Sequence, residues 1–209
     1  AVYPNYEQTM QMLTSARSEG ANSLLQQGTT ALKADNISEA VALLKGALEL
    51  NPSLGQANNL LKLAEQNNNK DYYLKKATKA EVDNDWVAAE NYYLKALDFD
   101  QFDSALVSKL KSVRVNKELQ LINQANAYIS QGYLYKAVET FKQAQEYSFA
   151  DNNVQQKALQ AFLSAKINQE VERFIEDDRY GSAYYWYNKL QEVNPQFEDL
   201  FSKKQKVED

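Results

Sequence analysis

The chain of 209 residues contains no cysteine and no histidine. Without thiolate or imidazole groups, disulfides, metal sites of the Cys/His type and Cys or Ser–His catalysis are excluded. Six Gly and three Pro are too few for a turn-rich β fold. No run of about 18 apolar residues occurs, so we expect no helix that inserts into a membrane. These absences favour a helical chain that uses no metal and no cofactor.

The balance of charges disfavours a nucleic-acid partner. The 23 basic and 28 acidic residues give a net charge of −5, whereas a nucleic-acid partner requires a basic face that displaces counterions from phosphates. The six Gly are scattered singly and form no phosphate-binding loop, and no nucleophile elbow or kinase motif occurs. We therefore predict no nucleic-acid partner and no enzymatic activity, with a catalytic helical array as a remote alternative.

Two acidic clusters could in principle bind calcium. One surrounds a turn at residues 81–85 and the other a turn at residues 176–178. Neither has the mid-loop Gly and closing Glu of a calcium loop, and a helix is expected to follow each turn. We interpret these carboxylates as helix caps.

An internal repeat is the strongest signal in the sequence. Each copy begins with a turn residue. Counted from that residue, an apolar residue, which we call the wedge, follows at position +2 and a small residue at +5. A large apolar residue stands at +9, and a further apolar residue stands at +12. The turn residues are Asp35, Asn84, Gly132 and Asp178, and the wedges are Ile37, Trp86, Leu134 and Tyr180. The buried columns are Ala40, Ala89, Ala137 and Ala183, then Leu44, Tyr93, Phe141 and Tyr187, then Ala47, Ala96, Ala144 and Leu190. Small residues opposite large ones allow two antiparallel helices to pack closely, so we expect these columns to form the core.

The first copy resembles the tetratricopeptide repeat (TPR), from Gly28 through the turn at Asp35 to the closing Asn51-Pro52. Asn194-Pro195 closes the last copy in the same way, while Gln101 and Phe149 stand where Pro would be in the other two. The resemblance implies an all-α, right-handed solenoid of αα-hairpins, a superhelix of about four repeats. It also implies a protein-binding scaffold.

The period departs from that family. The small residues stand at positions 40, 89, 137 and 183, which gives intervals of 49, 48 and 46 residues, against about 34 in tetratricopeptide repeats. The excess is about four helical turns. We therefore predict that the first helix of each repeat is elongated, over 5–34, 53–83, 103–131 and 151–177. A break near Asn67-Asn68-Asn69, which would give three helices in that repeat, is the alternative, because Asn lowers helix propensity.

The second helices are predicted at 37–50, 86–99, 134–147 and 180–193. The whole chain, 1–209, is then one repeat domain with repeats at about 5–52, 53–101, 102–149 and 150–195. Residues 196–209 are expected to begin a truncated capping helix.

Aromatic residues provide candidate contacts, since Tyr and Trp dominate protein interfaces. Fourteen Tyr occur, many of them paired. Adjacent helix residues point about 100° apart, so one member of each pair is expected outside the core. In the last run, Tyr180, Ala183, Tyr184 and Tyr187 are predicted to face the partner helix. Trp186, Leu190 and Val193 would pack on the tail at Phe197, Leu200 and Phe201, or form an open end. The candidate contacts are Tyr92, Tyr133, Tyr185 and Trp186.

The family resemblance also implies a groove lined by the first helices. Its lining would be Leu25, Thr29, Leu74, Thr78, Ile122, Asn126, Asn168 and Glu172. No matching basic residues accompany the two Asn, which disfavours a clamp for a partner's C-terminal carboxylate. The mixed apolar and amide lining suits an extended or helical segment of a protein partner.

The cellular setting is left as alternatives. The start Ala1-Val2-Tyr3-Pro4 in place of Met is expected for a processed product or an excised fragment. Helical repeats of this kind precede the pore-forming part of some secretins, which suggests the bacterial envelope, in a secretion system or type IV pilus. The alternatives are a cytoplasmic adaptor of a signalling protein and a module that self-associates through its repeat ends.

Overall fold

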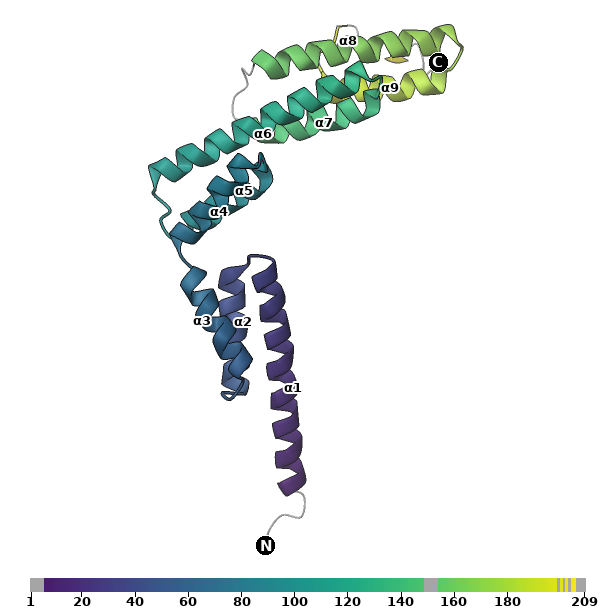
Figure 1. Cartoon of the computed structure of the whole chain (residues 1–209). Coiled ribbons are helices and arrows are strands. Elements are labelled where there is room, and N and C mark those ends of the chain that lie inside the picture. The colour runs from purple at the N-terminus through teal and green to yellow at the C-terminus, as the bar shows by residue number, and fades with distance from the viewer. Residues whose placement is uncertain (1–5, 149–153, 199, 201, 203, 206–209) are drawn as a thin grey trace. The chain divides into compact units, whose positions relative to one another are not determined.

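The computed structural model describes residues 6–148, 154–198, 200, 202 and 204–205, and all regular structure within them is α-helical (Figure 1). The helices are α1 (Tyr6–Lys33), α2 (Ile37–Leu50), α3 (Gly55–Asn67), α4 (Lys70–Val82), α5 (Trp86–Leu97), α6 (Ser104–Ser130), α7 (Leu134–Tyr147), α8 (Val154–Glu176) and α9 (Tyr180–Val193). The pairs α1–α2, α6–α7 and α8–α9 pack as helical hairpins. The predicted all-α helical-repeat class is confirmed.

The chain divides into two compact units. Unit 1 comprises Ala1–Lys76 and Leu94–Phe102, and unit 2 comprises Ala77–Tyr93 and Asp103–Asp209. In unit 1, α2 packs on α1 and α3. In unit 2, the hairpins α6–α7 and α8–α9 pack on each other through contacts of α7 and α6 with α8. The assignment of residues 1–209 to a single repeat domain stays a prediction.

Helix lengths follow the predicted pattern in three of the four repeats. The first helices α1, α6 and α8 have 28, 27 and 23 residues, and α2, α7 and α9 have the predicted bounds. Elongation of the first helix therefore explains the long period in these repeats.

The second repeat contains a break that we predicted only as the alternative. Its first segment is split into α3 and α4 at Asn68 and Asn69. The Asn69 side chain donates to the Gln66 carbonyl at 2.7 Å and accepts from the Tyr72 amide at 2.9 Å. These bonds satisfy backbone groups at both new helix ends. The prediction of one continuous helix over 53–83 is therefore wrong.

The four predicted turns share one backbone geometry. Their central residues have positive φ: 56° at Asp35, 56° at Asn84, 78° at Gly132 and 55° at Asp178. In the first turn, the Asn36 amide donates to the Ala31 carbonyl at 2.8 Å and the Asp35 amide to the Leu32 carbonyl at 3.1 Å. The same pair of bonds recurs in the other three turns. This is the Schellman motif, which ends a helix with a left-handed residue, and it explains the choice of Asp, Asn and Gly.

Helix capping also explains carboxylates in the acidic clusters. The Asp85 side chain accepts a hydrogen bond of 3.0 Å from the Ala88 amide in the first turn of α5. Two residues of the other cluster, Asp177 and Asp178, lie at the end of α8, where Asp178 occupies the left-handed position. The prediction of a capping role is confirmed for Asp85.

The predicted core columns are buried. All twelve residues of the three columns are essentially inaccessible to solvent, from Ala40 in the first repeat to Leu190 in the last. The close helix approach is most evident at Gly28, where an added Cβ would lie 2.9 Å from Cγ of Leu44. The repeated residues therefore determine how the helices pack, because small residues lie opposite the large residues of the neighbouring helix.

The wedge column is less regular than predicted. Ile37 is buried, but Trp86 and Leu134 are half-buried and Tyr180 is 47% exposed. Tyr180 begins α9 and donates to the Asp178 carboxylate in the turn at 3.1 Å, so its ring follows the turn instead of entering the core. The prediction that Tyr180 lies on the buried face of α9 is therefore wrong.

The tail covers the far side of α9. Leu200 belongs to the same core cluster as Leu190 and Val193, and Phe197 and Trp186 pack against that cluster. The stripe on α9 therefore packs on the tail, as one of the two predicted alternatives. Phe201, like Phe149 of the repeat pattern, lies outside the described residues.

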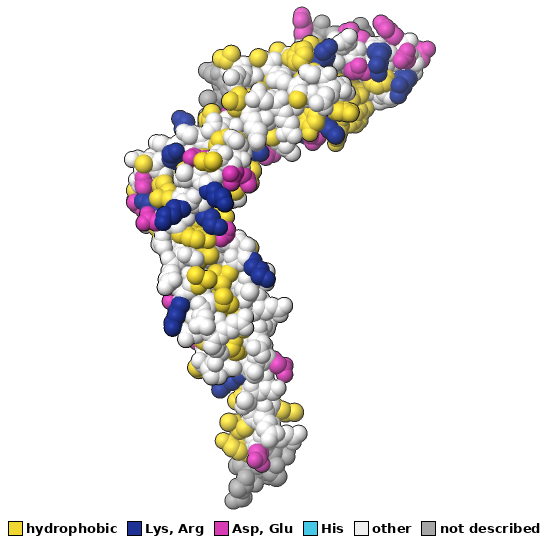
Figure 2. Space-filling view, viewed as in Figure 1, with side chains coloured by type: hydrophobic (Ala, Val, Ile, Leu, Met, Phe, Trp, Pro, Cys, Tyr) yellow, Lys and Arg dark blue, Asp and Glu magenta, His cyan; other side chains and the backbone are white. Residues whose placement is uncertain are grey.

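The first half of α1 carries exposed apolar side chains. Because α1 is twice as long as α2, its first half extends beyond that helix, and the exposed apolar residues there include Tyr6, Met10 and Leu13. Figure 2 shows apolar side chains gathered near this N-terminal end of α1. Over the described residues, none of the helices combines the length and the apolar character needed to cross a membrane.

Candidate functional site

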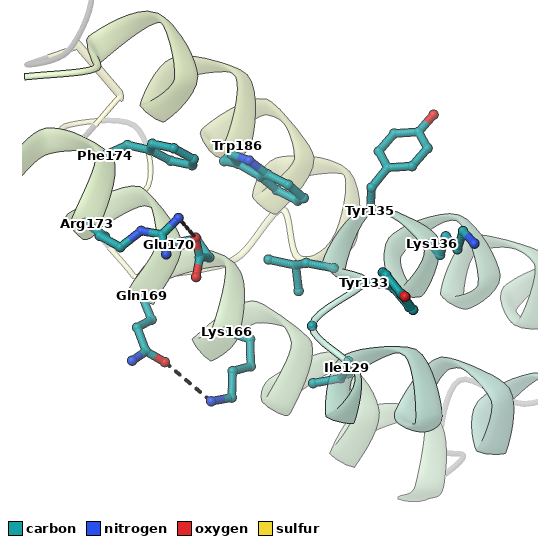
Figure 3. A pocket seen from close by; sticks show the side chains of 12 residues that line it. Ile129, Tyr133, Tyr135, Lys136, Lys166, Gln169, Glu170, Arg173, Phe174 and Trp186 are labelled. Atoms are coloured by element: carbon teal, nitrogen blue, oxygen red, sulfur yellow. Dashed lines mark hydrogen bonds and ion pairs between the residues drawn. The ribbon is translucent and has the colours of Figure 1, made fainter. Parts of the chain in front are cut away.

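A groove in unit 2 lies where the α6–α7 turn faces α8 and α9. It has a volume of about 820 Å³ (Figure 3). The lining comes from four segments: the end of α6, the turn with the start of α7, the second half of α8, and Trp186 on α9. We call it the aromatic groove. Its lining residues are Ile129, Gly132, Tyr133, Leu134, Tyr135, Lys136, Lys166, Gln169, Glu170, Arg173, Phe174 and Trp186.

The turn between α6 and α7 places the aromatic residues of this groove. Gly132, in the left-handed conformation, ends α6 and turns the chain so that Tyr133, Leu134 and Tyr135 follow immediately at the start of α7. The rings of Tyr133 and Tyr135 are 53% and 52% exposed. On the opposite side, Phe174 belongs to the core and Trp186 packs against it, so the groove has an apolar floor and an aromatic rim.

Basic side chains surround these rings. Nζ of Lys136 lies 5.1 Å from the centre of the Tyr133 ring, and the guanidinium carbon of Arg173 lies 5.3 Å from that of Phe174. Arg173 also forms an ion pair of 2.8 Å with Glu170, one helical turn earlier. Lys166 donates to the amide oxygen of Gln169 at 3.4 Å, and Figure 3 shows both of these contacts.

The groove carries an excess of positive charge. Three of its lining side chains are basic and one, Glu170, is acidic, on a chain whose net charge is −5. Among the described residues, no carboxylate lies within ion-pair distance of Lys136 or Lys166. On the face seen in Figure 2, by contrast, acidic and basic side chains are interspersed.

A neighbouring ion-pair network adds no net charge to this region. Lys189 lies 3.5 Å from Glu139 and 3.1 Å from Glu192, and Lys142 lies 3.0 Å from Glu192. Burial opposes ionisation of Glu192, but hydrogen bonds from the two lysines outweigh it and lower the pKa of this carboxyl. The network connects α7 to α9 behind the Tyr135 ring, whose centre lies 5.7 Å from Nζ of Lys189.

A smaller groove of about 390 Å³ lies between α6 and α8. It contains two of the residues expected in a groove formed by first helices, Ile122 and Asn126. Asn126 is exposed, but Ile122 is only 4% exposed because it belongs to the core cluster that α6 shares with α8. Ile122 forms the base of this groove, and its role in binding a partner stays a prediction.

The other residues expected in the groove belong to both units. Asn168 and Glu172 pair with each other at 2.7 Å on α8. Leu25, Thr29 and Leu74 are half-buried residues of unit 1, and Thr78 is exposed in unit 2. Their role in binding stays a prediction.

The four aromatic candidate contacts differ in their position relative to the aromatic groove. Tyr133 and Trp186 both line the aromatic groove. Tyr185 is exposed beside it, with its ring edge-on to Trp186 at 5.6 Å, while Tyr92 is half-buried on α5. Sequence reasoning did not identify the basic residues of the groove, because Lys136, Lys166 and Arg173 come from two helices and share no motif.

Unit 1 has a polar cluster around the first turn. The Tyr72 hydroxyl donates to one oxygen of Asp35 at 2.7 Å, and Lys76 donates to the other at 3.0 Å. Lys95 donates to the Asp35 carbonyl at 2.9 Å. These bonds attach the left-handed turn to α4 and α5, so we interpret the cluster as structural. A cavity of about 530 Å³ lies beside it, lined in part by Asn36, Tyr73 and Lys95.

This cluster leads to a testable prediction for pH dependence. Burial, followed by the hydrogen bond to the negative Asp35, raises the pKa of Tyr72 to about 12. The neutral phenol is therefore favoured in the folded state, whose stability is retained below the ordinary tyrosine pKa of about 10 and falls as the pH rises towards 12. Asp35→Asn keeps a residue that tolerates positive φ but removes the charge, so the pKa of Tyr72 should fall towards 10.

An NMR titration of the Tyr72 ring carbon that carries the hydroxyl measures this pKa. Asp100→Asn is the matched control, since Asp100 pairs with Lys70 at 3.1 Å and is not among the groups that raise the pKa of Tyr72. An unchanged Tyr72 pKa in Asp35→Asn would show that Asp35 does not act on this phenol.

Within the described residues, no group of three or more Asp or Glu side chains is arranged to hold a metal ion. The aromatic groove offers apolar surface, ring faces and cations. Such a set binds by burial of apolar side chains and by charge pairing.

Comparisons with known protein families and with curated proteins give no match. Among solved structures, the chain is similar to the TPR domain of P58(IPK), whose crystal structure is known at 2.5 Å. The sequences are 18% identical and the TM-score is 0.32. The alignment covers 90% of this chain and 58% of the P58(IPK) chain. The present chain therefore spans little more than half the length of the P58(IPK) chain.

Proposed function

We propose that this chain is a protein-binding scaffold and that the aromatic groove of unit 2 is its contact surface. The observation that carries the proposal is the combination, in one open groove, of exposed rings at Tyr133 and Tyr135 with a buried apolar floor. Exposed aromatic side chains over an apolar floor are typical of the residues that dominate protein interfaces. A repeat array supplies such a surface on rigid helices.

Site-specific photo-crosslinking in the source cells tests the proposal. A photoreactive phenylalanine analogue replaces Tyr135. The Tyr135 ring lies at the rim of the groove, so the replacement leaves the core unchanged. We expect covalent adducts of discrete mass with other proteins. Two positions serve as matched controls: Phe162, which lines the smaller groove, and Tyr6, which is exposed on α1.

The pattern of adducts decides between surfaces. Adducts from Tyr135 and none from Tyr6 support the aromatic groove. Adducts from Phe162 alone would move the contact surface to the groove between α6 and α8, and an absence of position-dependent adducts would contradict the proposal.

The cellular setting stays a prediction. A role in a bacterial envelope assembly, such as a secretion system or pilus, rests on the sequence resemblance alone, and a cytoplasmic signalling adaptor is its alternative. Recovery of the crosslinked partner from separated envelope and cytosolic fractions distinguishes the two settings. Self-association through the repeat ends is favoured by the exposed apolar residues of α1, and mass measured against protein concentration tests it.

A further inference from the structure

The charge of the aromatic groove identifies the kind of partner that fits it. We infer that, as the protein-binding site proposed above, it takes an acidic segment of a partner protein that inserts an aromatic or aliphatic side chain among the groove's rings. The inference deepens the proposed function and depends on it. It rests on charge complementarity and on the apolar floor.

Two lysines give the groove its unbalanced positive charge. Arg173 is paired with Glu170 at 2.8 Å, so these two side chains largely neutralise each other. Lys136 lies over the rings of Tyr128 and Tyr133 at 5.7 and 5.1 Å, and Lys166 contacts the neutral Gln169. Two ammonium groups thus face the groove without a carboxylate among the described residues. Carboxylates of a partner would supply the missing opposite charges.

The floor of the groove is apolar. Ile129 and Phe174 belong to the core cluster, and Leu134 and Trp186 pack against it at the groove. Figure 3 shows the Phe174 and Trp186 rings on one side and Tyr133 with Lys136 on the other. An apolar side chain placed between them would be buried against both sides, and flanking carboxylates would lie near the lysines.

A single-stranded nucleic acid is the competing occupant, because aromatic rings and basic side chains also bind bases and phosphates. The groove disfavours it because the excess of two positive charges in the lining is small on a chain of net charge −5. Nucleic-acid binding draws most of its affinity from many phosphate contacts.

The test uses the full chain and three fluorescein-labelled peptides. The first is a short Glu-rich peptide that carries Phe and Leu, and the other two replace every Glu by Gln or by Lys. Fluorescence anisotropy at low and at high salt measures their binding. We expect the Glu peptide to bind at least about tenfold more tightly than the Gln peptide, with the difference reduced by salt.

Charge reversal in the protein assigns this difference to the groove. Lys136→Glu combined with Lys166→Glu should weaken binding of the Glu peptide about tenfold and allow the Lys peptide to bind. The matched control is Lys62→Glu with Lys111→Glu, which changes the net charge equally at exposed positions outside the groove. Circular dichroism confirms that both double variants keep their helices.

The outcomes separate the two proposals. If the Gln peptide binds as tightly as the Glu peptide while adducts still form at Tyr135, the acidic partner is wrong and the scaffold function stands. If no adducts form at Tyr135 and no peptide binds, the groove is not a protein-binding site. Binding of a single-stranded oligonucleotide that is lost in the groove double variant, with no binding of the Glu peptide, would overturn the inference in favour of nucleic acid.

Discussion

Replacing Phe141 with Ala is expected to lower the free energy of unfolding of unit 2 by about 3–5 kcal/mol. Phe141 is fully buried on α7, in the core cluster that also contains residues of α6, α8 and α9. Truncation would leave a cavity in the middle of this packing, because helices held by several neighbours cannot collapse to fill it. The result would show that the large-residue column of the repeat carries much of the stability.

Urea denaturation followed by tryptophan fluorescence measures this loss. Both tryptophans, Trp86 and Trp186, lie in unit 2, so the signal reports on that unit. Phe162→Ala is the matched control, since this ring on α8 is 47% exposed and its removal should cost less than about 1 kcal/mol. Equal losses for the two variants would contradict the packing of the repeat described above.

Replacing Tyr133 and Tyr135 together with Ala is expected to weaken binding of the Glu-rich peptide about 30-fold, or about 2 kcal/mol. Both rings are about half exposed at the rim of the aromatic groove. They would be covered by a bound segment, and removing them also takes away the ring that lies under Lys136.

The control for this variant is the pair Tyr6→Ala and Phe102→Ala. These rings are at least as exposed as the two tyrosines but lie in unit 1. Anisotropy measures the affinity, and thermal unfolding shows whether the fold is kept. An affinity unchanged by loss of the two rim tyrosines would mean that the peptide binds elsewhere.

Much of the fold could be predicted because the repeat determines local structure and packing together. A left-handed residue such as Asp35 ends the first helix, and an Ala such as Ala40 allows the second helix to approach closely. Each signal requires only a few neighbouring residues. The bounds of α2, α7 and α9 followed directly from the aligned columns.

The break between α3 and α4 was harder to predict. Asn lowers helix propensity only modestly, so a run of three can remain helical. The break is stabilised by specific bonds, including one of 3.1 Å from Ser38 to Asn68, thirty residues apart in sequence. Contacts at such separations are not visible in a local pattern.

The candidate site could be predicted only in part. Tyr133 and Trp186 were identified as aromatic contacts, and the structure places both in one groove. The groove itself depends on how α6, α7, α8 and α9 pack, and its charge depends on which lysines have acidic neighbours. Lys136 and Lys142 lie on the same helix, yet within the described part of the chain only Lys142 of the two has a carboxylate partner, Glu192. That difference is decided by tertiary packing.

Amide NMR spectra of the full chain, recorded with increasing amounts of the Glu-rich peptide, test the central claim most directly. We expect shifts at residues 129–136, 166–174 and 186, which line the aromatic groove, and none along α1. Shifts confined to the groove between α6 and α8, or spread evenly over the chain, would contradict a binding site formed by these aromatic and basic residues.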